Sequence, residues 1–327
     1  MSWAWTVLLI APVAAAQTYK ITDLGTFTGG SVSQGQAINL SGQVAGYARF
    51  ANFNAHGFIW TTQDGLRDLG ALPPSSDFSV AQAINSFGDV AGYSFFGGSS
   101  INDHAVIWKH GRIHDLGTLG GSFSQANGIN DVGEVAGFSS GAVTSSHVFL
   151  WSEQQGMRDL GTLPGGFYSQ GIAINLKGEI AGISNAGDGQ WHGILWTKWA
   201  GMKALPNIPG GTSAAANGIN DLGQVVGGSG NFAVLWNPAG GVENLGVIPG
   251  QGWSTAFAIN DLGQVVGWSG FRAFLWSRSG GMQDLNNLIP TNSGWVLTSA
   301  TSINVRGQIT GGGTINGQAH AFVLTPR

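Results

Sequence analysis

The chain has no cysteine, little proline and few charged side chains. Its 327 residues include 10 Pro and no Cys, and only 9% are Asp, Glu, Lys or Arg, against about a quarter in an ordinary domain. The lack of cysteine excludes disulfides, a Cys nucleophile and Cys-ligated zinc. The net charge of −4 provides no basic field for nucleic acid. Beyond the N-terminal region, no apolar run is long enough for a membrane-spanning helix, so we expect no integral membrane segment.

Glycine and apolar residues dominate instead. The chain contains 55 Gly, and 43% of its residues are hydrophobic, a composition too apolar for disorder and typical of short strands joined by tight turns. Residues 1–16 read as a signal peptide, because a short apolar run ends in the small residues Ala14–Ala16. We therefore expect a secreted protein, extracellular or periplasmic, with one mature domain over residues 17–327.

One motif, Ile-Asn-x-x-Gly-x-(Val/Ile)-x-Gly, recurs with a period near 45 residues. Such a period indicates one supersecondary unit copied in tandem, so the fold must be inferred from the repeat. Residues shared by every copy are expected to build the copy, and function is expected where copies differ. The seven motif asparagines are Asn39, Asn85, Asn130, Asn175, Asn220, Asn260 and Asn304.

Each copy contains four extended segments, which predicts an all-β, seven-bladed β-propeller. The Asn-x-x-Gly tetrapeptide is a hairpin signal, since Asn bonds its own backbone and Gly accepts positive φ. Residues 19–25 resemble a fourth strand without a blade before it, and residues 320–324 resemble a third strand without a fourth. We expect the N-terminal strand to complete the last blade and close the ring, which removes exposed sheet edges.

Small residues lie four and two positions before each motif asparagine, as in Gly35 and Ala37. Alternate residues of a strand share a face, so we expect one flat face per inner strand. Bulky third-strand residues such as Trp60 and Trp108 are expected to pack against it, because protein interiors are filled densely.

The third strand recurs as His-Gly-Phe-Ile-Trp at 56–60, His-Val-Phe-Leu-Trp at 147–151 and His-Ala-Phe-Val-Leu at 320–324. Together with Asp-Leu-Gly and Ile-Asn-x-x-Gly, these segments resemble the bacterial HAF-repeat extracellular proteins over residues 19–324. The resemblance implies an exported repeat protein. It implies no reaction and no catalytic residue.

Five histidines hold one repeat position, which raises the question of a metal site. Equivalent positions on different blades lie far apart, so we expect neither a metal site nor a cofactor. We expect each histidine to bond an aspartate of the fourth strand instead, as in His147 with Asp159 and His320 with Asp23, because buried polar groups need partners. His192 is the exception, with Ala204 opposite it.

The loop between the second and third strands varies most among copies. It is long in the first four copies and shrinks to Gly228–Asn231 and Ser269–Phe271 in the fifth and sixth. In a propeller these loops share one face with the blade-to-blade connections, here named the variable face. The short loops predict a depression there, with aromatics and Arg suited to a sugar or peptide. Exposed aromatics that merely cover the core are the alternative. The predicted ligand-binding residues are Trp191, Phe232, Trp253, Phe271, Arg272 and Trp295.

We therefore expect an exported, monomeric, non-enzymatic binding module for a glycan or an extracellular protein. One alternative is a polysaccharide lyase or glycoside hydrolase on the same fold, since fold does not decide function. The sequence has no nucleophile elbow, no zinc-protease motif and no phosphate loop to favour it. The other alternative is a structural component of the envelope or matrix.

Overall fold

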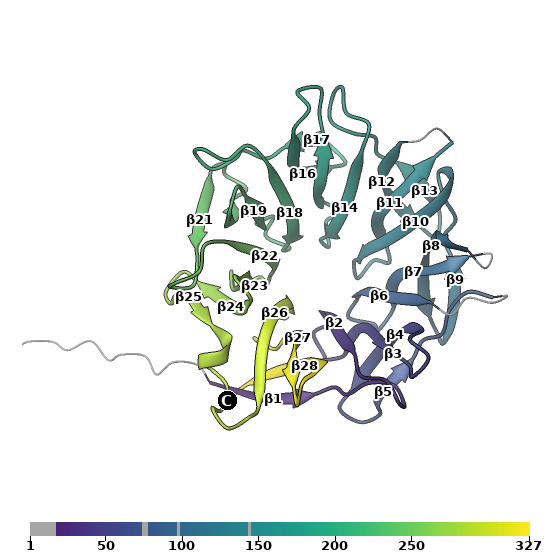
Figure 1. Ribbon diagram of the computed structural model, residues 1–327. Coiled ribbons are helices and arrows are strands. Elements are labelled where there is room, and N and C mark those ends of the chain that lie inside the picture. The colour runs from purple at the N-terminus through teal and green to yellow at the C-terminus, as the bar shows by residue number, and fades with distance from the viewer. Residues whose placement is uncertain (1–17, 74–77, 97–98, 143–144) are drawn as a thin grey trace, which may run out of the picture.

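The computed structural model describes residues 18–73, 78–96, 99–142 and 145–327. Within these residues the strands form seven four-stranded antiparallel sheets, arranged as blades around a common centre (Figure 1). The protein is a seven-bladed β-propeller, as the repeat predicts. The expected signal peptide lies outside the described residues. No helix in the described part of the chain is long and apolar enough to cross a membrane.

The blades follow chain order, and each runs from an inner to an outer strand. Blade 1 comprises β2 (Ser33–Ile38), β3 (Val44–Arg49), β4 (Ala55–Thr61) and β5 (Gly65–Asp68), and blade 2 comprises β6 (Ser79–Ile84), β7 (Val90–Phe96), β8 (Ser99–Lys109) and β9 (Arg112–Asp115). Blade 3 comprises β10 (Gly120–Ile129), β11 (Val135–Gly141), β12 (Ser146–Ser152) and β13 (Gly156–Asp159), and blade 4 comprises β14 (Ser169–Ile174), β15 (Ile180–Asn185), β16 (Trp191–Thr197) and β17 (Gly201–Ala204). Blade 5 comprises β18 (Ala214–Ile219), β19 (Val225–Ser229), β20 (Phe232–Trp236) and β21 (Val242–Gly246), and blade 6 comprises β22 (Ser254–Ile259), β23 (Val265–Ser269), β24 (Arg272–Ser277) and β25 (Gly281–Asp284). After the 3₁₀ turn η1 (Leu285–Asn287), blade 7 comprises β26 (Trp295–Ile303), β27 (Ile309–Ile315), β28 (Gln318–Pro326) and β1 (Tyr19–Asp23).

The predicted closure of the ring is present. Strand β1 pairs antiparallel with β28, from Tyr19 opposite Pro326 to Asp23 opposite Phe322. The Tyr19 backbone N–H also donates to the Leu288 carbonyl at 2.9 Å. The Tyr19 side chain is fully buried in the core of blade 7, and this burial raises the pKa of its phenol to about 12. The first strand is therefore held by a ladder and by core packing at once.

The inner strand of each blade does not present one flat face. A register shift falls between the two small positions in all seven blades, as between Gly35 and Ala37. The extra residue, Gln36 in blade 1, makes a β-bulge, which breaks the alternation of side chains. Gly35 therefore lies against Thr310 and Gly311 of blade 7, whereas Ala37 lines the central channel. The expectation that both positions share a face is wrong for this reason.

Apolar clusters between neighbouring blades form the core. Trp60 and Phe58 of β4 pack with Ala321 and Val323 of β28, across the boundary between blades 1 and 7. Gly46 makes room for this packing, because a Cβ there would lie 2.8 Å from the Phe58 ring. Truncating one such aromatic typically costs about 3–5 kcal/mol. The small residue that accommodates a bulky third-strand side chain is thus the second glycine of the motif.

Buried serines fasten one blade to the next. Ser79 at the start of β6 accepts from the Gly57 backbone N–H at 3.0 Å and donates to the Gly70 carbonyl at 2.8 Å. Ser124 and Ser169 make the same pair of bonds in blades 3 and 4. Since Gly57 belongs to β4 of blade 1, each such hydroxyl satisfies backbone groups of the preceding blade, which would otherwise be costly to bury.

We expect removal of residues 17–25 to lower the free energy of unfolding by several kcal/mol. The deletion takes away the β1–β28 ladder and the buried Tyr19, and it leaves β28 as a free edge open to aggregation. Chemical denaturation and light scattering would measure both effects. Lys20→Ala, an exposed position on the same strand, is the control. Unchanged stability of the deletion variant would show that the strand does not close the ring.

Candidate functional site

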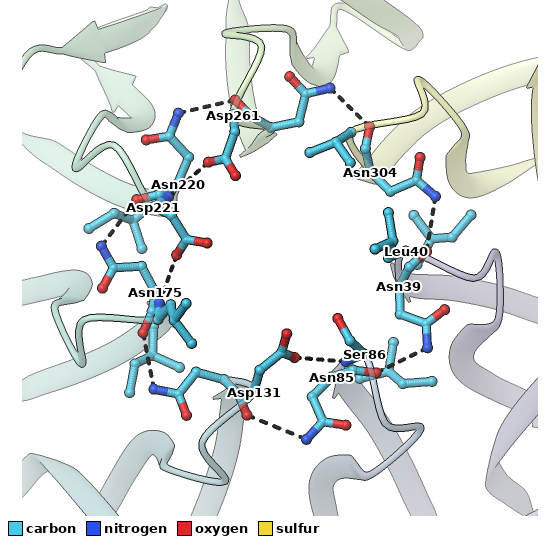
Figure 2. A pocket seen from close by; sticks show the side chains of 18 of the residues that line it. Asn39, Leu40, Asn85, Ser86, Asp131, Asn175, Asn220, Asp221, Asp261 and Asn304 are labelled. Carbon is cyan, nitrogen blue, oxygen red and sulfur yellow. Dashed lines mark hydrogen bonds between the residues drawn. The ribbon is translucent and has the colours of Figure 1, made fainter.

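The motif asparagines form a closed circle of hydrogen bonds at one end of the channel. The Nδ2 of Asn39 donates to the Asn85 carbonyl, and the pattern continues blade by blade until Asn304 donates to the Asn39 carbonyl (Figure 2). The seven donor–acceptor distances lie between 2.9 and 3.4 Å. We name this the asparagine ring, and the end of the propeller that carries it the turn face.

Each ring asparagine also caps its own turn. The Oδ1 of Asn260 accepts from the backbone N–H groups of Leu262 and Gln264 at 3.1 and 3.0 Å, and its Nδ2 contacts the Gln264 side chain at 2.8 Å. Gly263 takes the positive φ of +74° that the turn requires. The predicted turn-capping role is confirmed. The lateral bond to the next blade was not predicted, because a motif within one copy carries no information on the contact between copies.

The asparagine ring surrounds a cavity of about 410 Å³, the channel mouth. Three of the residues that follow the ring asparagines are acidic, namely Asp131, Asp221 and Asp261. Figure 2 shows their carboxylates directed toward the open centre. One oxygen of each accepts a backbone N–H of the preceding blade at 2.8–3.0 Å. Among the described residues, no Lys, Arg or His lines the mouth.

Every Asn-x-x-Gly turn exposes one apolar side chain. Where the first central residue is Ser or Asp, the second is apolar; where the first is apolar, the second is polar. Their exposed fractions run from 40% to 77%. We name this set the apolar ring: Leu40, Phe87, Val132, Leu176, Leu222, Leu262 and Val305.

The channel behind the mouth is lined by the bulge residues and has a volume of about 550 Å³. Asn127 and Asn217 each donate to a backbone carbonyl of the next blade, at 2.8 and 2.9 Å. Gln36 and Gln82 also line the channel, and their side chains make no hydrogen bond within the described residues. Phe257 occupies the bulge position of blade 6. The channel therefore mixes polar bulge residues with Ile172, Phe257 and small or aliphatic side chains, and its lining is more apolar than polar.

Part of the predicted variable-face set comes together in blade 6. The rings of Trp253 and Phe271 meet edge to face at 5.8 Å between centroids. Trp253 meets Trp268 in the same way at 4.2 Å, and Trp268 stacks on Phe257 at 6.4 Å. The four rings form an aromatic ladder from the exposed Phe271 to the channel. The sequence analysis did not predict Trp268 or Phe257. The position of Trp268 in the second strand is also aromatic in the first three copies, and the bulge position of Phe257 is polar in most other copies.

Three of the other four predicted residues lie elsewhere. Trp295 is only 8% exposed and packs edge to face on Phe322 inside blade 7. Phe232 is half-buried against the core between blades 4 and 5. Trp191 meets Tyr168 in blade 4, away from the ladder.

Arg272 forms an ion pair within blade 6. Its Nη1 donates to the buried Asp284 carboxylate at 2.6 Å. None of the six predicted residues lines the cavities of about 410, 690, 550 and 310 Å³ found in the described residues. The depression expected beside the short loops is not among these four cavities.

The histidines form the pairs that their repeat position predicts. His56, His104, His147 and His320 each contact the expected aspartate through Nδ1 at 2.8–3.0 Å. His192 bonds Asp188 of its own loop through Nε2 at 3.0 Å. The pairs are half-exposed rather than buried, so each contributes less than a buried pair would. No group of three or more His, Asp or Glu residues suited to a metal ion occurs among the described residues.

Two of these carboxylates have lowered pKa values. Burial raises the pKa of Asp68, but the hydrogen bonds from His56 and the Gly70 N–H, with the attraction of His56, outweigh it and lower that pKa. The backbone N–H of Gln190, followed by the bond from His192, lowers the pKa of the exposed Asp188.

Asp103 is a partly buried acid on the variable face of blade 2. Its Oδ2 accepts from Gln125 Nε2 of blade 3 at 2.7 Å, while its buried Oδ1 has no partner. Burial raises the pKa of this carboxyl, and the Gln125 bond and His104 offset that rise only in part. Burial, with the negative charge of Asp103, also raises the pKa of the neighbouring Tyr93 to about 12. Asp77, an acid of the sequence segment between β5 and β6, lies outside the described residues.

Comparison with known proteins adds the fold alone. No protein-family model and no curated protein matches the chain. A streptogramin B lyase is similar over 95% of this chain and 98% of its own, with TM-score 0.58 and 9% identity. A virginiamycin B lyase from Staphylococcus aureus is similar over 94% and 99%, with TM-score 0.54 and 11% identity. An extracellular domain from B. thetaiotaomicron is similar over 93% of this chain but 39% of its own, with TM-score 0.55 and 8% identity. These proteins differ in function, so the likeness assigns none.

We expect Asn260→Ala to lower the free energy of unfolding by about 2–3 kcal/mol, because it leaves buried backbone groups unpaired. Asn260→Asp keeps the oxygen that caps the turn and removes the Nδ2 that donates to the Asn304 carbonyl and to the Gln264 side chain, so it tests these two donations together. Leu262→Ser, an exposed change in the same turn, is the control. Denaturation of the three variants compares them; an Asn260→Asp protein as stable as wild type would mean that the lateral bond contributes nothing.

We expect Asp103→Asn to stabilise the protein more at pH 7 than at pH 3. The folded protein holds the Asp103 proton more tightly than the unfolded chain, so the free energy of unfolding falls as pH rises through the interval between the two pKa values. Asn keeps the oxygen that accepts from Gln125 and removes this loss. Melting temperatures of both proteins across pH test the idea, and a difference independent of pH would contradict it.

Proposed function

We propose that this chain is an exported propeller of the HAF-repeat type that binds a glycan or an extracellular protein through its variable face, without catalysis. The observation that carries the proposal is the aromatic ladder of Phe271, Trp253, Trp268 and Phe257. An aromatic ring can stack on a sugar or an apolar side chain with little loss of conformational freedom.

The ladder stands on a short, fixed hairpin. Strands β23 and β24 pair from Ser269 opposite Arg272, so only Gly270 and Phe271 form the turn. Phe271 is 77% exposed at its tip, and Trp253 supports the ring from the preceding connection. The Arg272–Asp284 ion pair holds the start of β24 in place. The site would therefore be formed before a ligand arrives, which favours affinity.

The neighbouring blade leaves space beside this hairpin. The turn between β19 and β20 is equally short, with Ser229 opposite Phe232. In blade 2, by contrast, β7 and β8 extend the hairpin to Phe96. A ligand lying over blades 5 and 6 would meet lower loops than one over blade 2. Export and a monomeric state belong to the same proposal and rest on the apolar N-terminal segment and the closed ring.

A polysaccharide lyase or hydrolase is the second candidate, and Asp103 favours it. A partly buried acid with a free oxygen and a raised pKa is the kind of group that serves as a general acid. Tyr93 lies close enough for the charge of Asp103 to raise its pKa. The ladder is in blade 6 and Asp103 in blade 2, so the two candidates predict different sensitive residues.

We expect Phe271→Ala and Trp253→Ala to weaken ligand binding about thirtyfold, since truncating an aromatic anchor typically costs about 2 kcal/mol or more. Purified protein would first be screened on an array of glycans and matrix proteins, with product analysis for turnover. The matched control is Phe87→Ala, equally exposed at 77% on the turn face. Retained affinity in both ladder variants would refute the site, and turnover lost in Asp103→Asn would favour the enzyme.

A further inference from the structure

The fold does not require apolar side chains at the positions of the apolar ring. The central positions of an Asn-x-x-Gly turn are ordinarily polar, and here the side chains are 40–77% exposed. Each turn nevertheless carries one apolar residue. It is the first central residue of the turn in blades 1, 4 and 7 and the second in the others. A copied structural residue would keep one position. The apolar character belongs to the face as a whole, and exposed apolar surface of this kind marks interaction sites.

The asparagine ring makes this surface rigid. Each turn is bonded to the next at 2.9–3.4 Å, so the seven apolar side chains stand on one continuous platform around the mouth. A surface that needs no ordering on binding keeps more of its contact energy as affinity.

The mouth inside the apolar ring combines acids and aliphatic groups. Asp131, Asp221 and Asp261 line it together with Leu40, Leu176 and Val305. No described residue forms an ion pair with these three carboxylates, and each has one oxygen free of hydrogen bonds. A cationic head on an aliphatic stem, the chemistry of a Lys or Arg side chain, matches this lining.

We propose that the turn face docks a partner protein that inserts one Lys or Arg side chain into the channel mouth and rests apolar neighbours on the apolar ring. The cation meets Asp131, Asp221 and Asp261, and its stem lies along the aliphatic side of the mouth. Phe87 and Leu262, at 77% and 71% exposed, supply the outer contacts. This surface is on the opposite side of the propeller from the aromatic ladder and does not depend on the function proposed for it.

Charge argues against two other occupants. A second copy stacked face to face would bring the three acids of one mouth toward those of the other, which is repulsive. An anionic bilayer would meet the same carboxylates with like charge, which the exposed Lys177 and Arg306 of these turns offset only in part. Both are distinguishable in solution, by the mass of the free protein and by sedimentation with vesicles.

The test uses purified protein and an array of decapeptides with Leu, Phe and Ala flanks around one central residue, which is Lys, Arg, norleucine or Glu. The best peptide is then titrated calorimetrically. Asp131→Asn, Asp221→Asn and Asp261→Asn are combined in one variant, because Asn keeps the oxygen that accepts the backbone N–H. Phe87→Ser with Leu262→Ser removes outer contacts, and Phe167→Ser, 68% exposed in the β13–β14 connection on the variable face, is the matched control.

We expect the Lys and Arg peptides to bind, with affinity falling as salt rises. The triple Asn variant and the Phe87→Ser, Leu262→Ser variant should each bind at least tenfold more weakly, and Phe167→Ser should bind as wild type does. Preference for norleucine or Glu, no saturable binding, or full affinity in the triple Asn variant would overturn the proposal. If the free protein forms dimers that Leu262→Ser dissociates, the turn face binds a second copy instead. If the protein binds vesicles and Leu262→Ser abolishes this binding, the turn face binds a bilayer instead.

Discussion

Seven side-chain amides set the geometry on which the rest of the structure depends. Each motif asparagine uses its oxygen to cap its own hairpin and its Nδ2 to hold the carbonyl of the next asparagine. The same residue therefore fixes the turn and the rotation from one blade to the next. Because the seventh amide returns to the first carbonyl, the pattern is satisfied only when the ring is complete. A ring left open at one blade boundary would leave an amide and a carbonyl without partners.

The β-bulge gives each inner strand two different sides. Before the bulge, small residues such as Gly35 allow the preceding blade to approach closely; after it, small residues such as Ala37 line the channel. The bulge residue itself projects between them, and in Asn127 and Asn217 it bonds the next blade. Buried serines add bonds from blades 1, 2, 3, 4 and 6 to the blade before. Polar contacts of short side chains thus join the blades, and among the described residues only Lys109–Glu153 and Arg278–Glu243 are ion pairs between blades, which agrees with the low content of charged residues.

Periodicity in the sequence was enough to predict blade number and strand order, because the four strand segments recur in each copy. Closure was predicted from the incomplete copies at residues 19–25 and 320–324, and the His–Asp pairs from residue types that recur at one position in several copies. The bulge was not predicted, since an extra residue in one strand leaves the period unchanged. The asparagine ring was not predicted either, although its residues were, because its bonds run between copies. The variable-face site was predicted from loop length and residue type. Trp253 and Phe271 lie together, but Trp295 is buried and Arg272 is bonded to Asp284, which only the three-dimensional packing decides.

The two faces of the ring follow opposite rules, and this bears on where function lies. On the variable face, copies differ in loop length and in aromatic content, so any site there belongs to particular blades. On the turn face, length is constant and each turn carries one apolar and one polar residue, so any site there belongs to the whole ring. Chemistry confined to residues that vary was the natural expectation from a repeat. The turn face shows that this expectation is incomplete. Its residues vary from copy to copy, yet the surface that they form together keeps its apolar character, and a partner contacts that surface rather than any single position.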